Sequence, residues 1–286
     1  GARSFGHSVI QQLPAFGVAR AECLYGATVK PDSELGSRRL VVFSDSGVLN
    51  WDERAREIQE ADILVGVGRL GDTEHSAVPA LEELAHLSNQ AGGRSPIAVV
   101  CLPPDGKRSM HRQPSLERLC ALEQLRDIQK AYSKVITVDA NRFVQDWFGS
   151  AELELTHLLA VQETAACVTA VLSMVRASDR GMSQVGYVPL RSGSYASARV
   201  PAPSALQAAT DAFDVCLGQL SEPSEAEIRV IHAYVQFNYG YDISSIFDVI
   251  ADLRASVSAN VSLTVDAHYR LPAFGPSVDV RLIAGA

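Results

Sequence analysis

The residues best placed to do chemistry form a short polar loop between an apolar run and a helix-like segment. The run "ADILVGVG" (61–68) leads into "RLGDTEHS" (69–76), and "AVPALEELAHL" (77–87) follows. A strand, a loop with Gly and Thr, and a helix form the usual phosphate cradle, because backbone N–H groups at a helix N-terminus attract anions. This loop also carries Asp72 and Glu74, whose carboxylates would repel a phosphate. Its position therefore indicates a nucleotide site, and its composition argues against one.

Two other kinds of site would use the residue types of this loop. A metal site would combine its acidic side chains with His75, but the nearest further histidine is His86, and metal sites need several ligands at suitable spacing. A Ser-His-Asp hydrolase would need a nucleophile elbow of the G-x-S-x-G type, and the chain has none. We therefore expect no metal and no catalytic residue here, and a polar surface loop is the remaining alternative.

Composition is that of an ordinary globular protein. The chain has 286 residues, 47% hydrophobic and 20% charged, with a formal net charge of −8. An acidic chain suits a nucleic-acid groove poorly, because such a groove needs a basic stripe. No run approaches the roughly 18 apolar residues of a membrane span, and no signal peptide leads the chain. Five single cysteines without a C-x-x-C pair are typical of reduced, mostly buried thiols.

Apolar runs and helix-like segments alternate over the first two thirds of the chain. The pattern predicts strands at 39–44, 62–68, 95–104 and 133–143, and helices at 51–61, 77–93 and 116–132. Such alternation is typical of a parallel, doubly wound sheet.

A long helix is expected at 151–178, and it is apolar on most sides. A helix of this kind is buried, so we expect it to run between two packed units. The segment 178–203, rich in Gly, Ser and Pro, is expected to be a transition. The last third predicts a smaller α+β domain, with helices at 204–219 and 242–257 and strands at 227–240, 260–271 and 277–286. Asp242 is the expected N-cap of the second of these helices.

Several motifs, in order, resemble the FtsZ branch of the FtsZ/tubulin superfamily. The stretch "LPPDGKRSM" (102–110) resembles the family's "KPFSFEGKRRM", and "VITVDANRF" (135–143) resembles "LIVIPNDRL". From residue 231 onward the chain follows the family's order of strand, Gly turn, helix and closing strands, and the long apolar helix takes the place of the family's core helix. The resemblance implies a Rossmann-like GTPase-type α/β domain at 1–150, a connecting helix at 151–178 and a smaller α+β domain at 179–286.

Residue by residue, the resemblance implies a degenerate nucleotide site. The family's phosphate loop reads "GGGTGTG"; Gly71 and Thr73 match it, but Asp72 and Glu74 stand where glycines let the backbone approach the phosphates. At about 4 Å and an effective dielectric near ~20, each added carboxylate would repel a phosphate charge by on the order of 4 kcal/mol.

The other nucleotide positions of the family are altered too. Arg3, Ser4 and Phe5 stand at glycine positions of the first loop, and His7 replaces its Asn. The base-stacking Phe aligns with His157, the guanine-reading Asp with Val161, and the last Arg of "EGKRR" with Ser109. The positions equivalent to nucleotide contacts are Gly1, Ser4, Gly6, His7, Gly68, Gly71, Asp72, Thr73, Glu74, Ser76, Asp105, Ser109, Asn141, His157 and Val161. We expect no cofactor, and GTP or GDP binding is disfavoured.

The family's acidic loop "NVDFADVK", which completes the hydrolysis site of a neighbouring subunit, has no counterpart. The segment "VRASDRGMSQVGYVPLRSGS" (175–194) offers Asp179 as a lone carboxylate. GTP hydrolysis is therefore not expected.

Three functions remain open from the sequence. The first is a degenerate FtsZ-like domain that binds an authentic FtsZ and regulates its assembly in bacterial or plastid division; plastid-division regulators with a degenerate FtsZ-like domain make the plastid stroma as natural a location as the bacterial cytoplasm. The second is a divergent GTPase that forms its own filament. The third is a static scaffold for an unrelated partner. The altered loops favour the first or third over the second, and we expect the first, with no nucleic-acid partner and no membrane span.

Overall fold

The chain forms two compact units, Gly1–Thr169 (unit 1) and Ala170–Ala286 (unit 2). The computed structural model describes residues 5–16, 21–24, 26–29, 40–44, 61, 63–73, 76–90, 96–105, 115–144, 152–179, 190–202, 204–220, 228–238, 241–242, 244–270 and 277–285. The boundary between the units falls inside one long helix, so each unit is described by itself.

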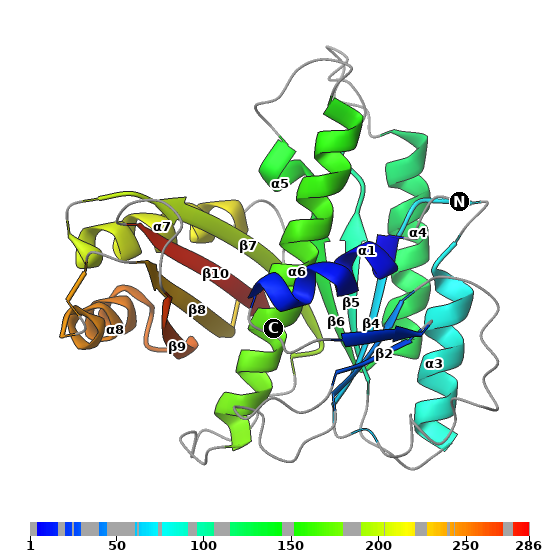
Figure 1. Ribbon diagram of the computed structural model, residues 1–286, viewed down its shortest axis with the longest axis horizontal. Helices are drawn as coiled ribbons and strands as arrows, with labels where there is room; N and C mark the ends of the chain where they lie inside the picture. Colours follow the sequence, from blue (N-terminus) through cyan, green and yellow to red (C-terminus); the bar gives the residue numbers. More distant parts are fainter. Residues whose placement is uncertain are drawn as a thin grey trace. The chain divides into compact units, whose positions relative to one another are not determined.

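Unit 1 is built on a mainly parallel sheet (Figure 1). The strands β3 (Leu40–Ser44), β4 (Ile63–Arg69), β5 (Ile97–Leu102) and β6 (Lys134–Asp139) pair in parallel in that order. Every residue of β5 is buried, and parallel strands covered on both faces are expected to have such continuous apolar sequences. The predicted α/β class is confirmed. The sequence did not predict β1 (Ala21–Leu24) and β2 (Gly26–Val29), which extend the sheet antiparallel beyond β3.

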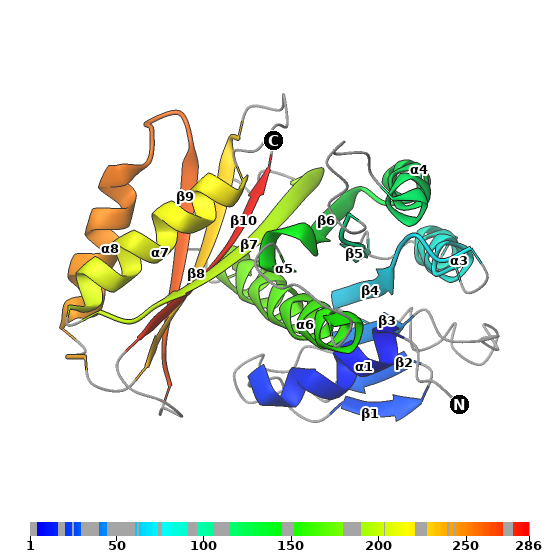
Figure 2. The same cartoon turned by 90° about the horizontal axis from the view of Figure 1, so that it is seen from above.

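Helices cover both faces of this sheet, as Figure 2 shows. The helices α3 (Val78–Gln90) and α4 (Leu116–Ala131) pack side by side on one face, where Leu81, Ala121 and Ile128 join the core. On the other face lies α1 (Phe5–Gln12), which continues into the 3₁₀ turn η1 (Leu13–Phe16). The short α5 (Asn141–Val144) follows β6. The helix predicted at 51–61 lies outside the described residues.

The predicted long helix is confirmed as α6 (Glu152–Asp179), which is buried on all sides in its middle. Its segment Leu155–Val175 has the length and apolar composition of a membrane-spanning helix. The prediction that no stretch approaches a membrane span is therefore wrong on composition. However, 67% of that window is buried inside the protein, and the core helix of a globular protein meets the same criterion, so the segment is weak evidence for a span.

Unit 2 is an α+β layer, as expected. Its strands are β7 (Ser192–Val200), β8 (Val230–Asn238), β9 (Ser262–Arg270) and β10 (Val278–Gly285), in the order β7-β10-β8-β9. β10 is antiparallel to both neighbours, and β8 and β9 are parallel. The helices α7 (Ala205–Leu220) and α8 (Ser245–Ser256) cover one face, where Phe213, Val249 and Val280 form the core.

Two local predictions in this unit are wrong. The segment 178–203 contains β7 rather than only a transition, because its small residues still form a complete backbone ladder with β10 from Gly193 to Val200. Asp242 is not the N-cap of α8, which begins at Ser245 after the cap position Ser244. The Asp242 carboxylate instead accepts a hydrogen bond from the Ser244 N–H at 3.1 Å, within the turn that precedes the helix.

Candidate functional site

The loop that follows β4 is held in place by α4. Leu70 is fully buried, and its N–H donates to the Cys101 carbonyl at 3.0 Å. Gly71 has a φ of 99°, a backbone conformation that residues other than glycine rarely adopt. A Cβ at Gly71 would lie 2.7 Å from the Glu117 carbonyl oxygen. A glycine is therefore required at position 71 by the backbone conformation and by the close approach of α4.

The side-chain amide of Gln124, on α4, bonds to this loop at three places. Its Oε1 accepts from the Gly71 N–H at 2.7 Å, and its Nε2 donates to the Asp72 carbonyl at 3.2 Å and to Ser76 Oγ at 3.3 Å. Ser76 Oγ also accepts from the Val78 N–H at 3.3 Å. One backbone donor of the loop, at Gly71, and one at the start of α3, at Val78, thus have partners within the protein.

The charges around the loop do not favour an anion. Asp72 and Thr73 are exposed, and Glu74 lies outside the described residues. The nearby cation, Arg69, donates to Glu117 Oε1 at 2.5 Å. This pair neutralises the positive charge that a phosphate would need, although half-exposed pairs of this kind stabilise a protein by only about 1 kcal/mol or less.

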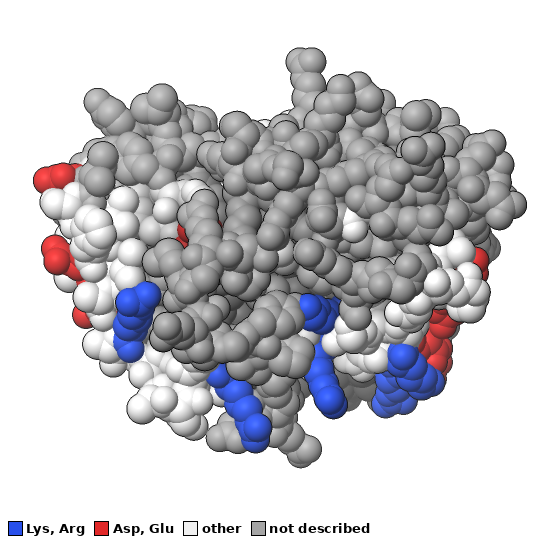
Figure 3. Space-filling model, turned by 90° about the horizontal axis from the view of Figure 1, so that it is seen from below, with Lys and Arg blue, Asp and Glu red and all other residues white. Residues whose placement is uncertain are grey.

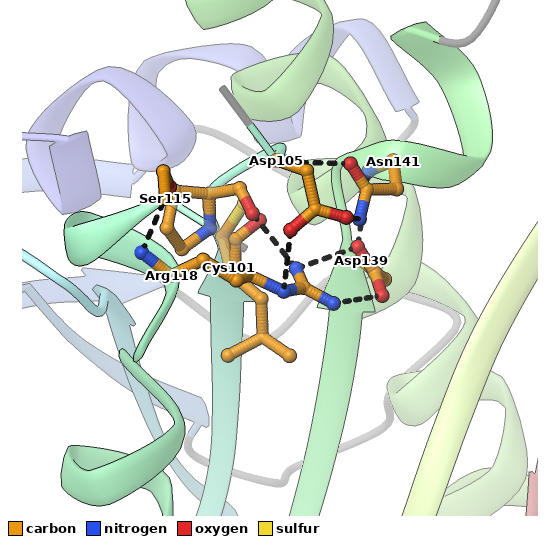
Figure 4. Close-up of polar contacts among 8 residues, drawn as sticks. Cys101, Asp105, Ser115, Arg118, Asp139 and Asn141 are labelled. Carbon is orange, nitrogen blue, oxygen red and sulfur yellow. Dashed lines mark hydrogen bonds and ion pairs between the residues drawn. The ribbon is translucent and has the colours of Figure 1, made fainter. Parts of the chain in front are cut away.

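A second polar cluster lies where β5 and β6 end (Figure 4). Ligands of open α/β sheets bind at the carboxyl ends of the strands. Here Arg118, on α4, donates to both carboxylate oxygens of Asp139 at 2.8 and 2.5 Å and to the Pro103 carbonyl at 2.7 Å. The Arg118 side chain is only 11% exposed. Its charge is therefore engaged in holding α4 to the end of β6.

Two predicted nucleotide positions meet in this cluster and bond to each other. Asn141 Oδ1 accepts from the Asp105 N–H at 2.7 Å, while Asn141 Nδ2 donates to Asp105 Oδ2 at 2.9 Å. The Asn141 N–H donates to Asp139 Oδ1 at 3.0 Å. A sugar or base would have to compete with these intramolecular bonds.

The predicted base-stacking position, His157, is in contact with another aromatic side chain of the protein. Phe5 is buried, and its ring meets the ring of His157 edge-on with centroids 5.8 Å apart. Burial lowers the pKa of His157, and the charge of Arg69 lowers it further. Val161, at the guanine-reading position, is a buried aliphatic side chain. An aromatic side chain of the chain itself thus contacts the surface on which a base would stack.

The remaining predicted positions that the structure describes lie on two separate elements. Gly6 is buried in α1, Gly68 lies in β4, and His7 Nε2 is 3.0 Å from Gln11 Nε2 on its own helix. Among the residues that the structure describes, no group of three or more His, Cys, Asp and Glu could hold a metal ion. Besides Glu74, several other predicted or compared positions lie outside the described residues or have side chains that do: Gly1, Arg3, Ser4, His75, Ser109 and Asp179.

Sequence reasoning missed the residues that close the site. Gln124 and Arg118 lie in an amphipathic helix, where polar residues are most simply read as a solvated face. Asp139 was part of a compared motif, "VITVDANRF", but its partner lies on another element. Only the geometry of α4 against the strand ends brings these three together.

A third polar cluster lies in unit 2. Ser173 Oγ donates to Asp266 Oδ2 at 2.5 Å and lies 3.1 Å from His232 Nε2. A hydroxyl has one proton, so Ser173 must accept from a protonated Nε2, which leaves Nδ1 of His232 as an acceptor. That Nδ1 is buried with no hydrogen-bond partner among the described residues. Burial lowers the pKa of His232 to about 4.

Asp266 is the shared acceptor of this cluster. Its Oδ2 also lies 2.9 Å from His268 Nε2. Burial alone would raise the pKa of Asp266, but hydrogen bonds from His268 and Ser173 outweigh it, and the pKa lies below its ordinary value. The carboxylate does not contact Nδ1 of His232, and Ser173 is 2% exposed. The cluster is therefore a structural network rather than a nucleophile relay.

The described thiols and charges bear on two further expectations. Cys101, Cys167 and Cys216 are buried thiols that form no disulfide. Burial raises the pKa of Cys101 to about 12, so this thiol is unreactive. On the face drawn in Figure 3, the described lysines and arginines stand apart from one another, and acidic side chains also reach it. The absence of a nucleic-acid partner stays a prediction.

Comparison with known proteins shows the fold. No family model matches the chain's sequence, and no curated protein matches it. Among solved structures, an empty FtsZ dimer from M. jannaschii matches with a TM-score of 0.64 and 14% identity, over 82% of this chain and 66% of that one. A point mutant of the same FtsZ matches with a TM-score of 0.62, 15% identity and coverage of 82% and 68%.

A CetZ structure matches as well. CetZ from Methanosaeta thermophila has a TM-score of 0.50 and 14% identity, over 82% of this chain and 65% of that one. The chain thus spans just under two thirds of the FtsZ dimer's chain, 66%. At these identities the likeness concerns the fold alone. This chain has the fold of FtsZ and CetZ, and the expected fold class is confirmed.

Proposed function

We propose that this chain is a catalytically degenerate FtsZ-fold domain that binds an authentic FtsZ and limits the assembly of its filaments. The observation that supports this most is the loop after β4, whose Gly71 N–H is bonded to Gln124 and whose Val78 N–H faces Ser76. A phosphate would have to displace both partners and approach the exposed Asp72. Nucleotide binding at this loop is disfavoured, whereas the fold is kept. A protein-binding surface is therefore a better candidate for the function than nucleotide chemistry.

The mechanism follows from how such domains associate. One of the structural neighbours is an FtsZ dimer, which supports association between domains of this fold. A head-to-tail contact repeats and therefore builds open filaments. A domain that docks on a filament end, but offers neither a working phosphate loop nor an acidic loop, would receive the next subunit poorly. We infer that it acts as a cap, in the bacterial cytoplasm or the plastid stroma, without a nucleotide cofactor.

Sedimentation tests the proposal directly. FtsZ from the same source is polymerised with GTP while this chain is added up to an equimolar amount, and the pelleted fraction of FtsZ is expected to fall. An unrelated acidic protein of similar size serves as the control. An interface of standard size, about 1,600 Å² in total, should also give capture of FtsZ at tens of micromolar. An unchanged pellet without capture would contradict the proposal and favour a static scaffold.

Nucleotide titration separates the proposal from the divergent GTPase. Calorimetry with GTP and GDP, with and without Mg²⁺, is expected to show no binding in the low micromolar range. The occupied loop, the Asp105–Asn141 pair and Phe5 against His157 are the reasons. Tight binding, together with GTP-dependent light scattering by this chain alone, would favour a self-assembling GTPase instead.

A further inference from the structure

The strand β9 leaves one edge of the unit 2 sheet open within the described residues. It is the last strand in the order β7-β10-β8-β9 and pairs with β8 along its whole length, from Ser262 opposite Val230 to Arg270 opposite Asn238. The pairing has no bulge, and the strand has no proline. An uninterrupted edge of this kind presents a row of backbone donors and acceptors that can pair with another strand.

The side chains of β9 suit a further strand beside it. Leu263, Val265 and Ala267 pack against the core on the face that α7 and α8 cover, yet each is only partly buried. Thr264 and Asp266 alternate with them on the other face and are also partly buried. A neighbouring strand would cover the outer side of both rows.

We propose that β9 pairs antiparallel with β9 of a second copy of this chain, around a two-fold axis at Val265. In such a pair the residues directly opposite each other lie on the same face of the sheet. This register sets Leu263 opposite Ala267 and Thr264 opposite Asp266, so that an apolar row meets an apolar row and a hydroxyl meets a carboxylate.

The neighbouring registers fit less well. An axis at Asp266 would set the two Asp266 carboxylates opposite each other, and like charges in that position are destabilising. An axis at Thr264 would use residues 260 and 261, which precede the strand. The axis at Val265 pairs residues 262–268, all within β9, without opposed charges. The strand is thus complementary to itself in one register.

The helix beside this edge offers additional apolar surface. α8 packs against β9, whereas α7 packs against β7 and β10. Phe247 on α8 is 75% exposed. A two-fold axis perpendicular to the sheet keeps the helical layers of both copies on the same side, so the two α8 helices flank the seam. This dimer does not depend on FtsZ binding and would be formed by the chain alone.

Disulfide trapping tests the register. In the full chain, Val265→Cys places two thiols opposite each other, and mild oxidation is expected to give a covalent dimer. Leu263→Cys is the matched control, since it lies on the same strand face but its thiols would be several residues apart and too distant to bridge. Both are made in a Cys23→Ser, Cys120→Ser background, because Cys120 is half-buried and the side chain of Cys23 lies outside the described residues. Equal trapping of both variants, or of neither, would overturn the proposal.

Two substitutions of opposite charge test the interface without a covalent bond. Thr264→Asp sets a carboxylate opposite Asp266 of the second copy, and Thr264→Lys sets an ammonium there. Each contact occurs twice per dimer, so the dissociation constant is expected to rise about 2- to 30-fold for the first and to fall for the second. Sedimentation velocity gives the constants, and thermal unfolding shows that each variant is folded. A monomer at all concentrations, or shifts in the same direction, would overturn the proposal.

Discussion

Units 1 and 2 each hold a cluster of charged and polar side chains, and the two clusters are built differently. In unit 1, Arg118 and Asp139 form a bidentate ion pair. Beside it, Asn141 donates a hydrogen bond to the Asp105 carboxylate. In unit 2, Ser173 links Asp266 to a neutral His232 whose Nδ1 has no partner among the described residues. The first cluster joins opposite charges, and the second keeps one titratable group uncharged.

The difference shows what each cluster does. The unit 1 cluster occupies the strand ends, where a ligand of this fold would bind, and its groups are turned toward one another. A buried ion pair contributes little net stability but is costly to break. The unit 2 cluster is a structural network of hydrogen bonds. It lowers the free energy of unfolding only at a pH at which His232 of the unfolded chain is protonated. Substitutions of charged side chains should therefore lower stability through the unit 1 cluster, and a fall in pH should lower it through the unit 2 cluster.

Breaking the unit 1 ion pair is expected to have the largest effect. Arg118→Met removes the partner of a mostly buried Asp139 and the donor to the Pro103 carbonyl. Leaving one member of a buried pair unpaired lowers the free energy of unfolding by about 3–5 kcal/mol. Urea denaturation of the variant measures the loss. Adding Asp139→Asn should recover part of it, and fully additive losses would show that the pair is not coupled.

Acid should destabilise the protein through unit 2. The pKa of His232 is lowered from its ordinary value of 6.5 to about 4, so the unfolded chain takes up this proton at a higher pH than the folded one. Stability from this group is complete above about 6.5 and is lost as the pH falls toward 4, by about 3 kcal/mol. The lowered pKa of Asp266 acts in the same direction, but only below its ordinary value of 3.8. Denaturation at stepwise pH values measures the slope.

A matched pair of variants assigns that slope. His232→Gln keeps a donor for Ser173 but cannot be protonated, and it is expected to flatten the change in stability between pH 6.5 and 4. His86→Gln, on the exposed surface of α3, should leave it unchanged. An equal slope in the two variants would remove His232 as its source.

The sequence predicted most of the fold because the signals are local. Continuous apolar runs predict β4 and β5, and an apolar helix 28 residues long predicts α6. The strand β7 was missed because "SGSYASARV" has no apolar run, and its structure depends on pairing with β10, whose partner residues lie 78 to 92 positions further along the chain. Non-local pairing of this kind leaves little trace in a single segment.

The sequence predicted where the candidate site lies, but it did not predict the hydrogen bonds that hold the site together. The carboxylate at Asp72 and the missing glycines mark the loop as altered. That Gln124 bonds to this loop depends on the approach of α4, and its sequence separation from Gly71 is 53 residues. The tautomer of His232 likewise follows only from the proton of Ser173. Residues that act through a partner on another element are not identified by spacing.

Removing the loop's internal partner is expected to have an intermediate effect. Gln124→Ala deletes hydrogen bonds to Gly71, Asp72 and Ser76 and should lower the free energy of unfolding by about 1–2 kcal/mol. Amide hydrogen exchange at Gly71 should accelerate, because its N–H loses its acceptor. Gln129→Ala, on the exposed face of α4, is the control. Unchanged protection at Gly71 in the Gln124 variant would show that the loop is closed without that side chain.

The smallest effect is expected at the rim of the loop, where Arg69 pairs with Glu117 at 2.5 Å. The two side chains are 33% and 45% exposed, so water and salt screen the attraction. Glu117→Gln retains a hydrogen-bond acceptor but removes the charge, and the expected loss is about 0.2–1 kcal/mol. Raising the salt concentration to about 1 M shortens the Debye length to about 3 Å and should reduce the difference between parent and variant. Arg118→Met, whose pair is mostly buried, should keep most of its loss at the same salt concentration. If the two losses fell in parallel with salt, the contrast between a buried pair and a rim pair would not hold.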